Sequence, residues 1–495
     1  MTIDAQRAAA ERPGDAPALA AAIGARFERL PLCRWQVMVR LIVGTATFFE
    51  AFDQLLIAYA LPQLRSEWNL DTGHTTALMT VGSVGMLGGA LVSGRLADRV
   101  GRVKVIAGCI ALASLCNLAL TLCTSPEPFM AVRFVQGMAI GGEVPIAATF
   151  IAEITRAHQR GRFVLLFELV FPAGLTAGAL VAYWLVLLLG WRWMFGLAAL
   201  PVVLSVLVLR LVPESPRWLA DHGRHEQALA TMAAIETNVE NITGAPLPPP
   251  EPTPSVVPPR GKGGLRELFG GRYRKRMIVV GLLWFTGYFA NYGITSWLPT
   301  IYKSHFHLGL STALLYSTVT SCAGLLGCLI VALTVDRVGR RNTVIWCFAA
   351  AALCLLVLGL SASGTAVGVL IWTSLAAVFL FGCNICLYLY TPELFPTRIR
   401  ALGASMGGAM NRLGIVLGPI VVGAIYAGGA IGTVFVTLAA VAVAGSLTAA
   451  GGAEETSGRS LEDVAPEASR VRPGGAHPWP DIRDAFGGYP LCGGS

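Results

Sequence analysis

Apolar stretches long enough to cross a membrane recur along the chain, separated by short polar breaks. A helix needs about 20 mostly apolar residues to span the hydrocarbon core of a bilayer. Twelve stretches meet this requirement: residues 38–62, 75–97, 103–124, 127–153, 162–187, 191–212, 277–300, 311–335, 342–362, 366–391, 401–427 and 429–450. The pattern therefore predicts an all-α membrane protein with twelve transmembrane helices.

Polar segments divide these spans into two groups of six. The widest break contains the proline-rich run from Pro248 to Pro259, which cannot continue a helix and favours an extended chain. The sequence predicts five segments: a cytoplasmic N-terminal segment 1–37, an N-terminal half 38–212, a cytoplasmic linker 213–276, a C-terminal half 277–450 and a disordered cytoplasmic tail 451–495.

Two marker sequences occur once in each half. Gly94-Arg-Leu-Ala-Asp98-Arg99-Val-Gly101-Arg102 returns 238 residues later as Ala332-Leu-Thr-Val-Asp336-Arg337-Val-Gly339-Arg340. Glu153 with Arg160 returns 240 residues later as Glu393 with Arg400. Because both markers keep nearly the same offset, the two halves are expected to be duplicated, pseudo-symmetric six-helix units, with a binding site between them.

Basic residues gather in alternate loops. These loops carry Arg95, Arg99, Arg102 and Lys104, then Arg156, Arg160 and Arg162, then Arg337, Arg340 and Arg341, then Arg398 and Arg400. The other loops offer little beyond Arg65, Arg192 and Lys303. Because positive residues stay on the cytoplasmic side, both termini and the linker are predicted to be cytoplasmic. The N-terminus lacks the pattern of a cleaved signal peptide.

Composition agrees with a membrane protein and excludes other classes. The chain is 54% hydrophobic and only 13% charged, against about 25% charged residues in soluble proteins. Its net charge of +8 comes from short clusters rather than from a basic face for nucleic acid. The lone Cys383-x-x-Cys386 lies inside a membrane span, so no metal site is expected. No nucleophile or phosphate-loop motif appears, so neither an enzyme nor a cofactor is predicted.

Two acidic residues lie within the first span. An ionisable side chain at bilayer depth costs about 2.5 kcal/mol or more, so it is retained for a function. Glu50 and Asp53 are three positions apart on one helix face. Crowded carboxylates in an apolar region favour proton uptake, so they are predicted to relay protons. The alternative is a static ion pair with Arg133 or Arg412.

The fourth span carries a polar stripe. Arg133, Gln136, Ile140 and Glu143 follow one another at helical spacings of three and four. Arg133 and Glu143 are predicted to take part in proton coupling, with Glu143 as a second site of protonation. The alternative is that the stripe braces helix packing.

Arg412 in the eleventh span is the candidate anchor for a substrate. It follows Gly407, Gly408 and Asn411, which leave room beside it, and a guanidinium binds a carboxylate in bidentate fashion. A structural contact to backbone carbonyls is the alternative. Aromatic and amide side chains are predicted to line the pocket and stack on a ring, although each could equally serve packing: Trp284, Tyr288, Asn291, Tyr292, Asn384 and Tyr388.

The repeated marker resembles the signature loop of the major facilitator superfamily. The resemblance to this family covers residues 28–463. This resemblance implies that the marker residues, with Glu153, Arg160, Glu393 and Arg400, form gating loops in which Asp98 pairs with neighbouring cations and Gly101 permits a tight turn. The alternative is that these charges only set the orientation of the chain in the membrane.

Further motifs resemble the metabolite:proton symporters, in particular niacin and aromatic-acid transporters and their sugar-porter relatives. They are Pro213-Glu-Ser-Pro-Arg217, Asn291-Tyr292 with Trp297, Tyr390-Thr-Pro-Glu393 and Glu455-Thr-Ser-Gly458-Arg459. Aromatic-acid symporters resemble this chain in the spacing of two helix-1 acids, although Glu50 stands where aspartate is usual. The seventh span lacks the paired glutamines of sugar porters, which favours an aromatic acid over a sugar.

The resemblance implies a monomeric transporter of the inner cell membrane that moves a small organic acid together with protons by alternating access. Its partners would be the substrate, protons and the lipid bilayer, without nucleic acid. A sugar or polyol symporter and a proton-coupled efflux transporter remain as alternatives. A non-transporting receptor on the same fold is disfavoured because the tails are short.

Overall fold

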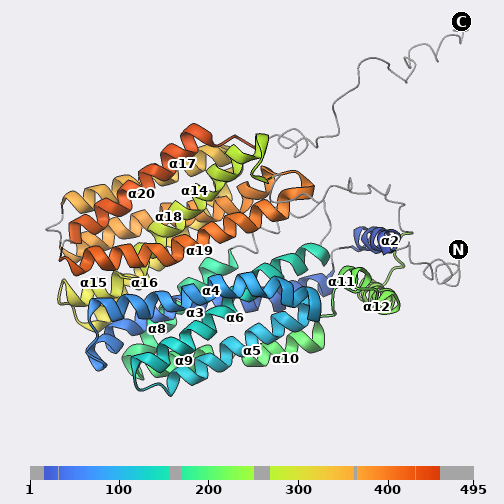
Figure 1. Ribbon diagram of the computed structural model, residues 1–495, viewed down its shortest axis with the longest axis horizontal. Coiled ribbons are helices and arrows are strands. Elements are labelled where there is room, and N and C mark those ends of the chain that lie inside the picture. The colour runs from blue at the N-terminus through green and yellow to red at the C-terminus, as the bar shows by residue number, and fades with distance from the viewer. Residues whose placement is uncertain are drawn as a thin grey trace, which may run out of the picture.

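The computed structural model describes residues 16–31, 33–154, 169–249, 268–361, 365–429 and 431–457. Within these ranges, twelve helical segments are long and apolar enough to cross a membrane. They form two bundles that lie side by side, and the helices of both bundles run roughly along the long axis of the molecule (Figure 1). The predicted all-α membrane fold with twelve spans is therefore confirmed.

The N-terminal half comprises residues 34–211. Its helices are α3 (Arg34–Glu67), α4 (Thr72–Val100), α5 (Arg102–Thr121), α6 (Pro126–Ile154), α8 (Val170–Leu188), α9 (Trp191–Ala198) and α10 (Val202–Leu211), the last two sharing one span. Several of these helices run past the predicted ends. Hydropathy marks only the part of a helix inside the hydrocarbon, whereas the 34 residues of α3 reach about 50 Å.

The C-terminal half comprises residues 271–452. Its helices are α14 (Gly271–Thr295), α15 (Leu298–Ser304), α16 (Leu310–Val338), α17 (Arg340–Leu360), α18 (Ala366–Glu393), α19 (Thr397–Ala427) and α20 (Ile431–Gly452), with α14 and α15 sharing one span. Matching helices pack in matching pairs in the two halves. The pairs α4–α6, α3–α8 and α5–α10 correspond to α16–α18, α14–α19 and α17–α20.

The halves meet along two equivalent seams, α4 against α19 and α8 against α16. Within each half, glycines let helices approach closely. A Cβ atom at Gly89 of α4 would overlap the carbonyl oxygen of Met138 on α6. In the same way, a Cβ at Gly327 of α16 would overlap the carbonyl oxygen of Val378 on α18. The duplicated sequence thus yields duplicated packing.

One end of the bundle, called here the terminal face, carries three further helices: α2 (Ala16–Glu28), α11 (Pro216–Asp221) and α12 (His225–Thr243) (Figure 1). The linker predicted at 213–276 is therefore helical before its proline-rich run. The helices form because apolar residues recur at helical spacing, and Ile23, Phe27, Met232 and Ile235 are buried together. The proline-rich residues from 250 onward lie outside the described part.

An ion cluster fixes α2 to the linker. Glu236 of α12 accepts hydrogen bonds from Arg26 Nη2 at 2.5 Å and Arg29 Nη2 at 2.6 Å. Burial acts to raise the pKa of Glu236, but the hydrogen bonds and charges of the two arginines outweigh it, so this pKa lies below its ordinary value. The contribution of Glu236 to the free energy of docking α2 is therefore fully present above the pKa of glutamate in the unfolded chain, about 4.3. It is lost as the pH falls through the lower pKa of Glu236 in the folded protein.

The substitution Glu236→Gln is expected to release α2 from the linker. A hydrogen bond to a charged group contributes about 2 kcal/mol, so the open population should rise about 30-fold. The measurement is the rate of trypsin cleavage after Arg26 and Arg29 in the folded protein. Glu226→Gln, on the same helix but without a described ion pair, is the control. Equal cleavage rates in both variants would show that the ion cluster does not hold α2.

Candidate functional site

The two acidic residues of α3 lie at the centre of the N-terminal half, and both are buried. Asp53 belongs to a chain of polar side chains from three helices. Its Oδ2 accepts a hydrogen bond from Gln136 Nε2 of α6 at 2.7 Å. Gln136 also donates to Asn117 of α5 at 2.7 Å and accepts from Arg133 Nη1 at 2.8 Å. Arg133 therefore reaches Asp53 through Gln136. It does not form the direct ion pair that was the alternative considered from the sequence.

Glu50 faces a different partner. Its carboxyl group lies within hydrogen-bonding reach of Glu143 on α6, and the charge of Arg412 acts on it from the other half. One oxygen of each of these glutamates has no hydrogen-bond partner among the described residues. With Asp53, the two glutamates line a cavity of about 40 Å³ between α3, α5 and α6, enough for water. The carboxyls predicted for proton coupling thus line one small, mostly apolar cavity.

Arg412 crosses the interface between the halves. Its Nη1 donates to the carbonyl of Gly408 at 3.3 Å, and its Nη2 donates to the carbonyl of Gly141 on α6 at 3.4 Å. Both contacts are long for hydrogen bonds of a charged donor, which are usually near 2.8 Å. Its Nε has no hydrogen-bond partner among the described residues. The backbone contact considered as the alternative role is present, but it leaves the guanidinium incompletely satisfied.

The aromatic residues of α14 form a row. Trp284 stacks on Tyr288 with ring centroids 5.6 Å apart, and Tyr288 stacks on Tyr292 at 5.9 Å. Tyr388 of α18 meets the Trp284 ring edge-on at 4.6 Å. Trp284 lies at one end of the row, where its indole N–H donates to Thr391 at 2.8 Å. The predicted ring-binding residues therefore form one wall of the C-terminal half.

This wall borders a cavity of about 30 Å³ lined by Tyr288, Asn291, Tyr292, Asn384 and Tyr388. Both amide atoms of Asn384 and the Oδ1 of Asn291 are buried without a hydrogen-bond partner among the described residues. A buried polar atom left unpaired costs about 1–3 kcal/mol. These amides are therefore available to a ligand, and five of the six predicted pocket residues come together here.

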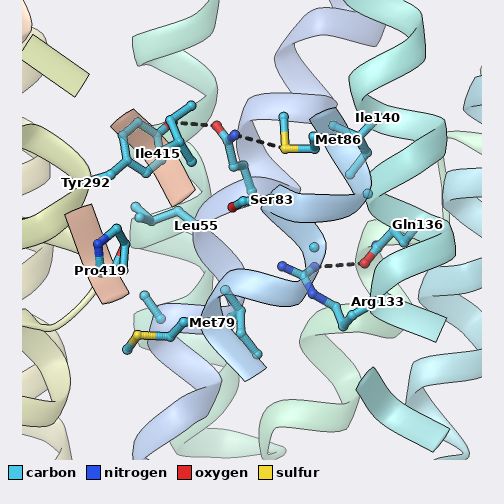
Figure 2. A pocket seen from close by; sticks show the side chains of 16 residues that line it. Leu55, Met79, Ser83, Met86, Arg133, Gln136, Ile140, Tyr292, Ile415 and Pro419 are labelled. Atoms are coloured by element: carbon cyan, nitrogen blue, oxygen red, sulfur yellow. Dashed lines mark hydrogen bonds between the residues drawn. The ribbon is translucent and has the colours of Figure 1, made fainter. Parts of the chain in front are cut away.

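A hydrogen bond joins the two halves across the central interface. Tyr292 donates its hydroxyl to Gln54 Oε1 of α3 at 2.5 Å, and Gln54 Nε2 contacts the sulfur of Met86 at 3.4 Å. Figure 2 shows these contacts beside the Arg133–Gln136 pair, in a cavity of about 30 Å³ whose lining comes from both halves. That volume holds water but not an organic acid. The structure thus represents a contracted central site.

The first predicted gating loop is held by a residue that the sequence did not assign to it. Gly101 adopts φ +120°, and a Cβ there would overlap Glu214. Glu214 Oε1 accepts from the backbone N–H of Arg102 at 2.9 Å, capping the first turn of α5. The Arg102 side chain pairs with Asp98 at 2.7 Å. Asp98 pairs with a neighbouring cation as the resemblance implies, within the N-terminal half.

The second loop repeats this arrangement. Gly339 adopts φ +90°, and Glu455 accepts from the backbone N–H of Arg340 at 2.8 Å. The Arg340 side chain pairs with Asp336 at 2.8 Å and approaches Glu393 at 3.4 Å. Glu455 belongs to the segment predicted as a disordered tail, but it is held by these contacts. The tail from residue 458 onward lies outside the described residues.

The remaining residues predicted for the gating loops differ in their exposure and contacts. Arg99 and Arg337 are exposed, and Gly94 borders open space. Arg400 donates from Nε to the carbonyls of Pro392 and Phe395. The side chain of Glu153 and the whole of Arg160 lie outside the described residues. Glu214 and Glu455 follow the same repeat as the markers, at an offset of 241 residues, and this spacing is the signal that could have identified them.

Comparisons with known proteins agree with this architecture. The niacin transporter NiaP of Acinetobacter baylyi is 32% identical over 447 residues, which cover 89% of this chain and 98% of that protein. The gallate transporter of Pseudomonas putida is 28% identical over 81% of this chain and 87% of its own length. The inward-open xylose transporter XylE from E. coli superposes with a TM-score of 0.65 at 19% identity, covering 87% of this chain and 99% of that one.

The profile of one family, described as sugar (and other) transporter, matches residues 40–468. That match spans most of the chain, including both predicted gating loops and all the residues of the central site. The family and the relatives are transporters and not enzymes. The chain belongs to the sugar (and other) transporter family of the major facilitator superfamily.

Proposed function

We propose that this transporter is a symporter that couples the movement of a small aromatic or related monocarboxylic acid to protons, by alternating access of its two halves. The relatives named as niacin and gallate transporters support the substrate class, since both compounds are aromatic carboxylic acids. The stacked row Trp284, Tyr288 and Tyr292 supports an aromatic ring in the substrate, because rings stack on rings.

The feature on which this proposal rests is the meeting of carboxyl groups and an arginine at the interface. Glu50 and Glu143 of one half lie against each other, and Arg412 of the other half acts on Glu50. Two like charges this close in an apolar region repel, and a proton bound by one carboxyl of the pair would remove that repulsion. Loss of that proton would draw Arg412 toward the glutamates, and its gain would free Arg412 for a substrate carboxylate.

The proposed cycle follows from this competition. A protonated carboxyl pair leaves Arg412 free, so proton and organic anion bind together and neutralise each other. The halves then rock about the seams α4–α19 and α8–α16, and the Gln54–Tyr292 contact breaks and re-forms. Release of the acid returns Arg412 to the glutamates. Coupling arises because each ligand stabilises the same intermediate.

A sugar or polyol symporter is the second proposal, supported by the unpaired amides of Asn291 and Asn384, which suit hydroxyl groups. A hydroxylated ring would not need Arg412, and this difference separates the two proposals.

Location in the cell membrane with cytoplasmic termini is proposed from the basic residues of the terminal face. A monomer is proposed because the site is complete within one chain.

The test is uptake of labelled nicotinate, benzoate, gallate, acetate and glucose into proteoliposomes with an imposed pH gradient. Nicotinate or another aromatic acid is expected to accumulate only with the gradient, and a protonophore should abolish accumulation. Accumulation of glucose but of no acid would establish the sugar alternative. Transport of acids that ignores the pH gradient would disprove proton coupling.

A further inference from the structure

A further cavity, called here the vestibule, lies at the end of the bundle away from the terminal face. It is lined by Gln63, Glu67, Trp191, Arg192, Trp193 and Lys303, among others. Its volume is about 420 Å³, against about 30 Å³ for the central cavity, and falls within the range of ligand pockets. The first five residues come from the N-terminal half and Lys303 from the C-terminal half, so the vestibule sits at the mouth of the interface.

The N-terminal wall of the vestibule is rigid and neutral. Both oxygens of Glu67 are engaged, by Arg192 Nη2 at 2.8 Å and by the Trp191 indole N–H at 2.8 Å. The Arg192 guanidinium lies 4.3 Å from the centroid of the Trp191 ring, which rests on Trp68 and Phe129. This wall therefore holds its shape without adding net charge.

The opposite wall carries positive charge that the described residues do not neutralise. Lys303 donates to the carbonyl of Pro62 at 3.0 Å and forms no ion pair with a described carboxylate. Arg65, at the end of α3 in the N-terminal half and outside the cavity lining, donates to the carbonyl of Leu70 and to the hydroxyl of Ser304, again without a described carboxylate partner. Two cations at one mouth attract anions from solution. The first turn of α9, at Gly190–Trp193, borders the cavity and adds a positive helix end.

We propose that the vestibule is a binding site for the carboxylate of an organic anion, distinct from the central site, in which Lys303 holds the carboxylate and the exposed ring of Trp193 covers an attached apolar group. This inference rests on the proposed function for its substrate class. Lys303 and Arg65 also connect the two halves at this mouth, through Pro62 and Ser304. A carboxylate competes with the Pro62 carbonyl for Lys303, so the bound anion loosens a contact that closes the mouth.

The transport test uses oriented membrane vesicles with substrate supplied to one face at a time. An exposed ion pair contributes about 0.2–1 kcal/mol, so Lys303→Gln should raise the half-saturation concentration for nicotinate roughly 1.4- to fivefold from the vestibule face. From the terminal face the value should stay unchanged. The difference should vanish in about 1 M salt, where charges are screened, and Lys303→Arg should restore it. Lys275→Gln, the same change at the terminal face, is the control.

Equal changes from both faces, or none, would overturn the vestibule site. Equilibrium binding of labelled nicotinate to the purified full chain at low salt gives an independent measure. Binding that depends on Lys303 and persists in Arg412→Gln is expected. If such binding occurs without transport, the proposed function fails and the vestibule stands. If transport occurs but neither binding nor half-saturation depends on Lys303, the vestibule fails and the proposed function stands.

Discussion

Proteoliposomes containing Asp53→Asn are expected to exchange substrate across the membrane but to lose accumulation driven by a pH gradient. Asparagine keeps the size of Asp53 and can still accept the hydrogen bond from Gln136, but it cannot relay a proton to Glu50 and Glu143 in the same cavity. Each pH unit supplies about 1.4 kcal/mol per proton, which is about a tenfold accumulation ratio. In the variant this ratio should fall to about one, while counterflow continues. The measurement is steady-state uptake beside counterflow in the same preparation.

The control for this variant is Asp71→Asn. Asp71 caps α4 on the vestibule face, accepting from the backbone N–H of His74 at 2.7 Å, and asparagine caps a helix about as well. Accumulation should therefore survive there. If Asp53→Asn still concentrates substrate tenfold per pH unit, the relay does not pass through Asp53. The pair Glu50 and Glu143 would then be the next position to test, by the same substitution to glutamine.

Much of the fold could be predicted from the sequence because its signals are long or repeated. A span of about 20 apolar residues has few other interpretations. The markers at Asp98 and Asp336 revealed the duplication. Glu214 and Glu455, at a nearly equal offset, accept hydrogen bonds from the backbone N–H groups of Arg102 and Arg340. Hydropathy could not give the full lengths of helices such as α3, because their ends lie outside the apolar core.

The partners within the site could not be predicted in the same way. Asn117 and Gln54 are single neutral residues in apolar helices, and no spacing distinguishes them from packing positions. Asp53 and Glu50 share a face of α3, yet Asp53 meets Gln136 and Glu50 meets Glu143. Which of the two meets which partner depends on the rotation and tilt of α6 against α3. These are tertiary variables that a one-dimensional pattern does not contain.

Arg412 links the two halves of the protein, since its side chain donates to the carbonyl of Gly141 in the N-terminal half and its charge acts on Glu50. A residue that only braced the interface would be equally necessary for every substrate. A residue that binds the substrate carboxylate would matter only for acids. Comparison of an acid with its neutral amide therefore separates these roles, because the two ligands share the ring and differ in charge.

Arg412→Lys is expected to raise the half-saturation concentration for nicotinate by about 10- to 100-fold, since lysine keeps the charge but loses the bidentate fork, and a charged hydrogen bond contributes about 1.5–3 kcal/mol. Any transport or binding of nicotinamide should change less than twofold. Labelled uptake and equilibrium binding of both compounds are the measurements, with Arg274→Lys at the exposed start of α14 as the control. Equal losses for acid and amide would show that Arg412 serves the interface, because a purely structural role cannot distinguish a carboxylate from a carboxamide.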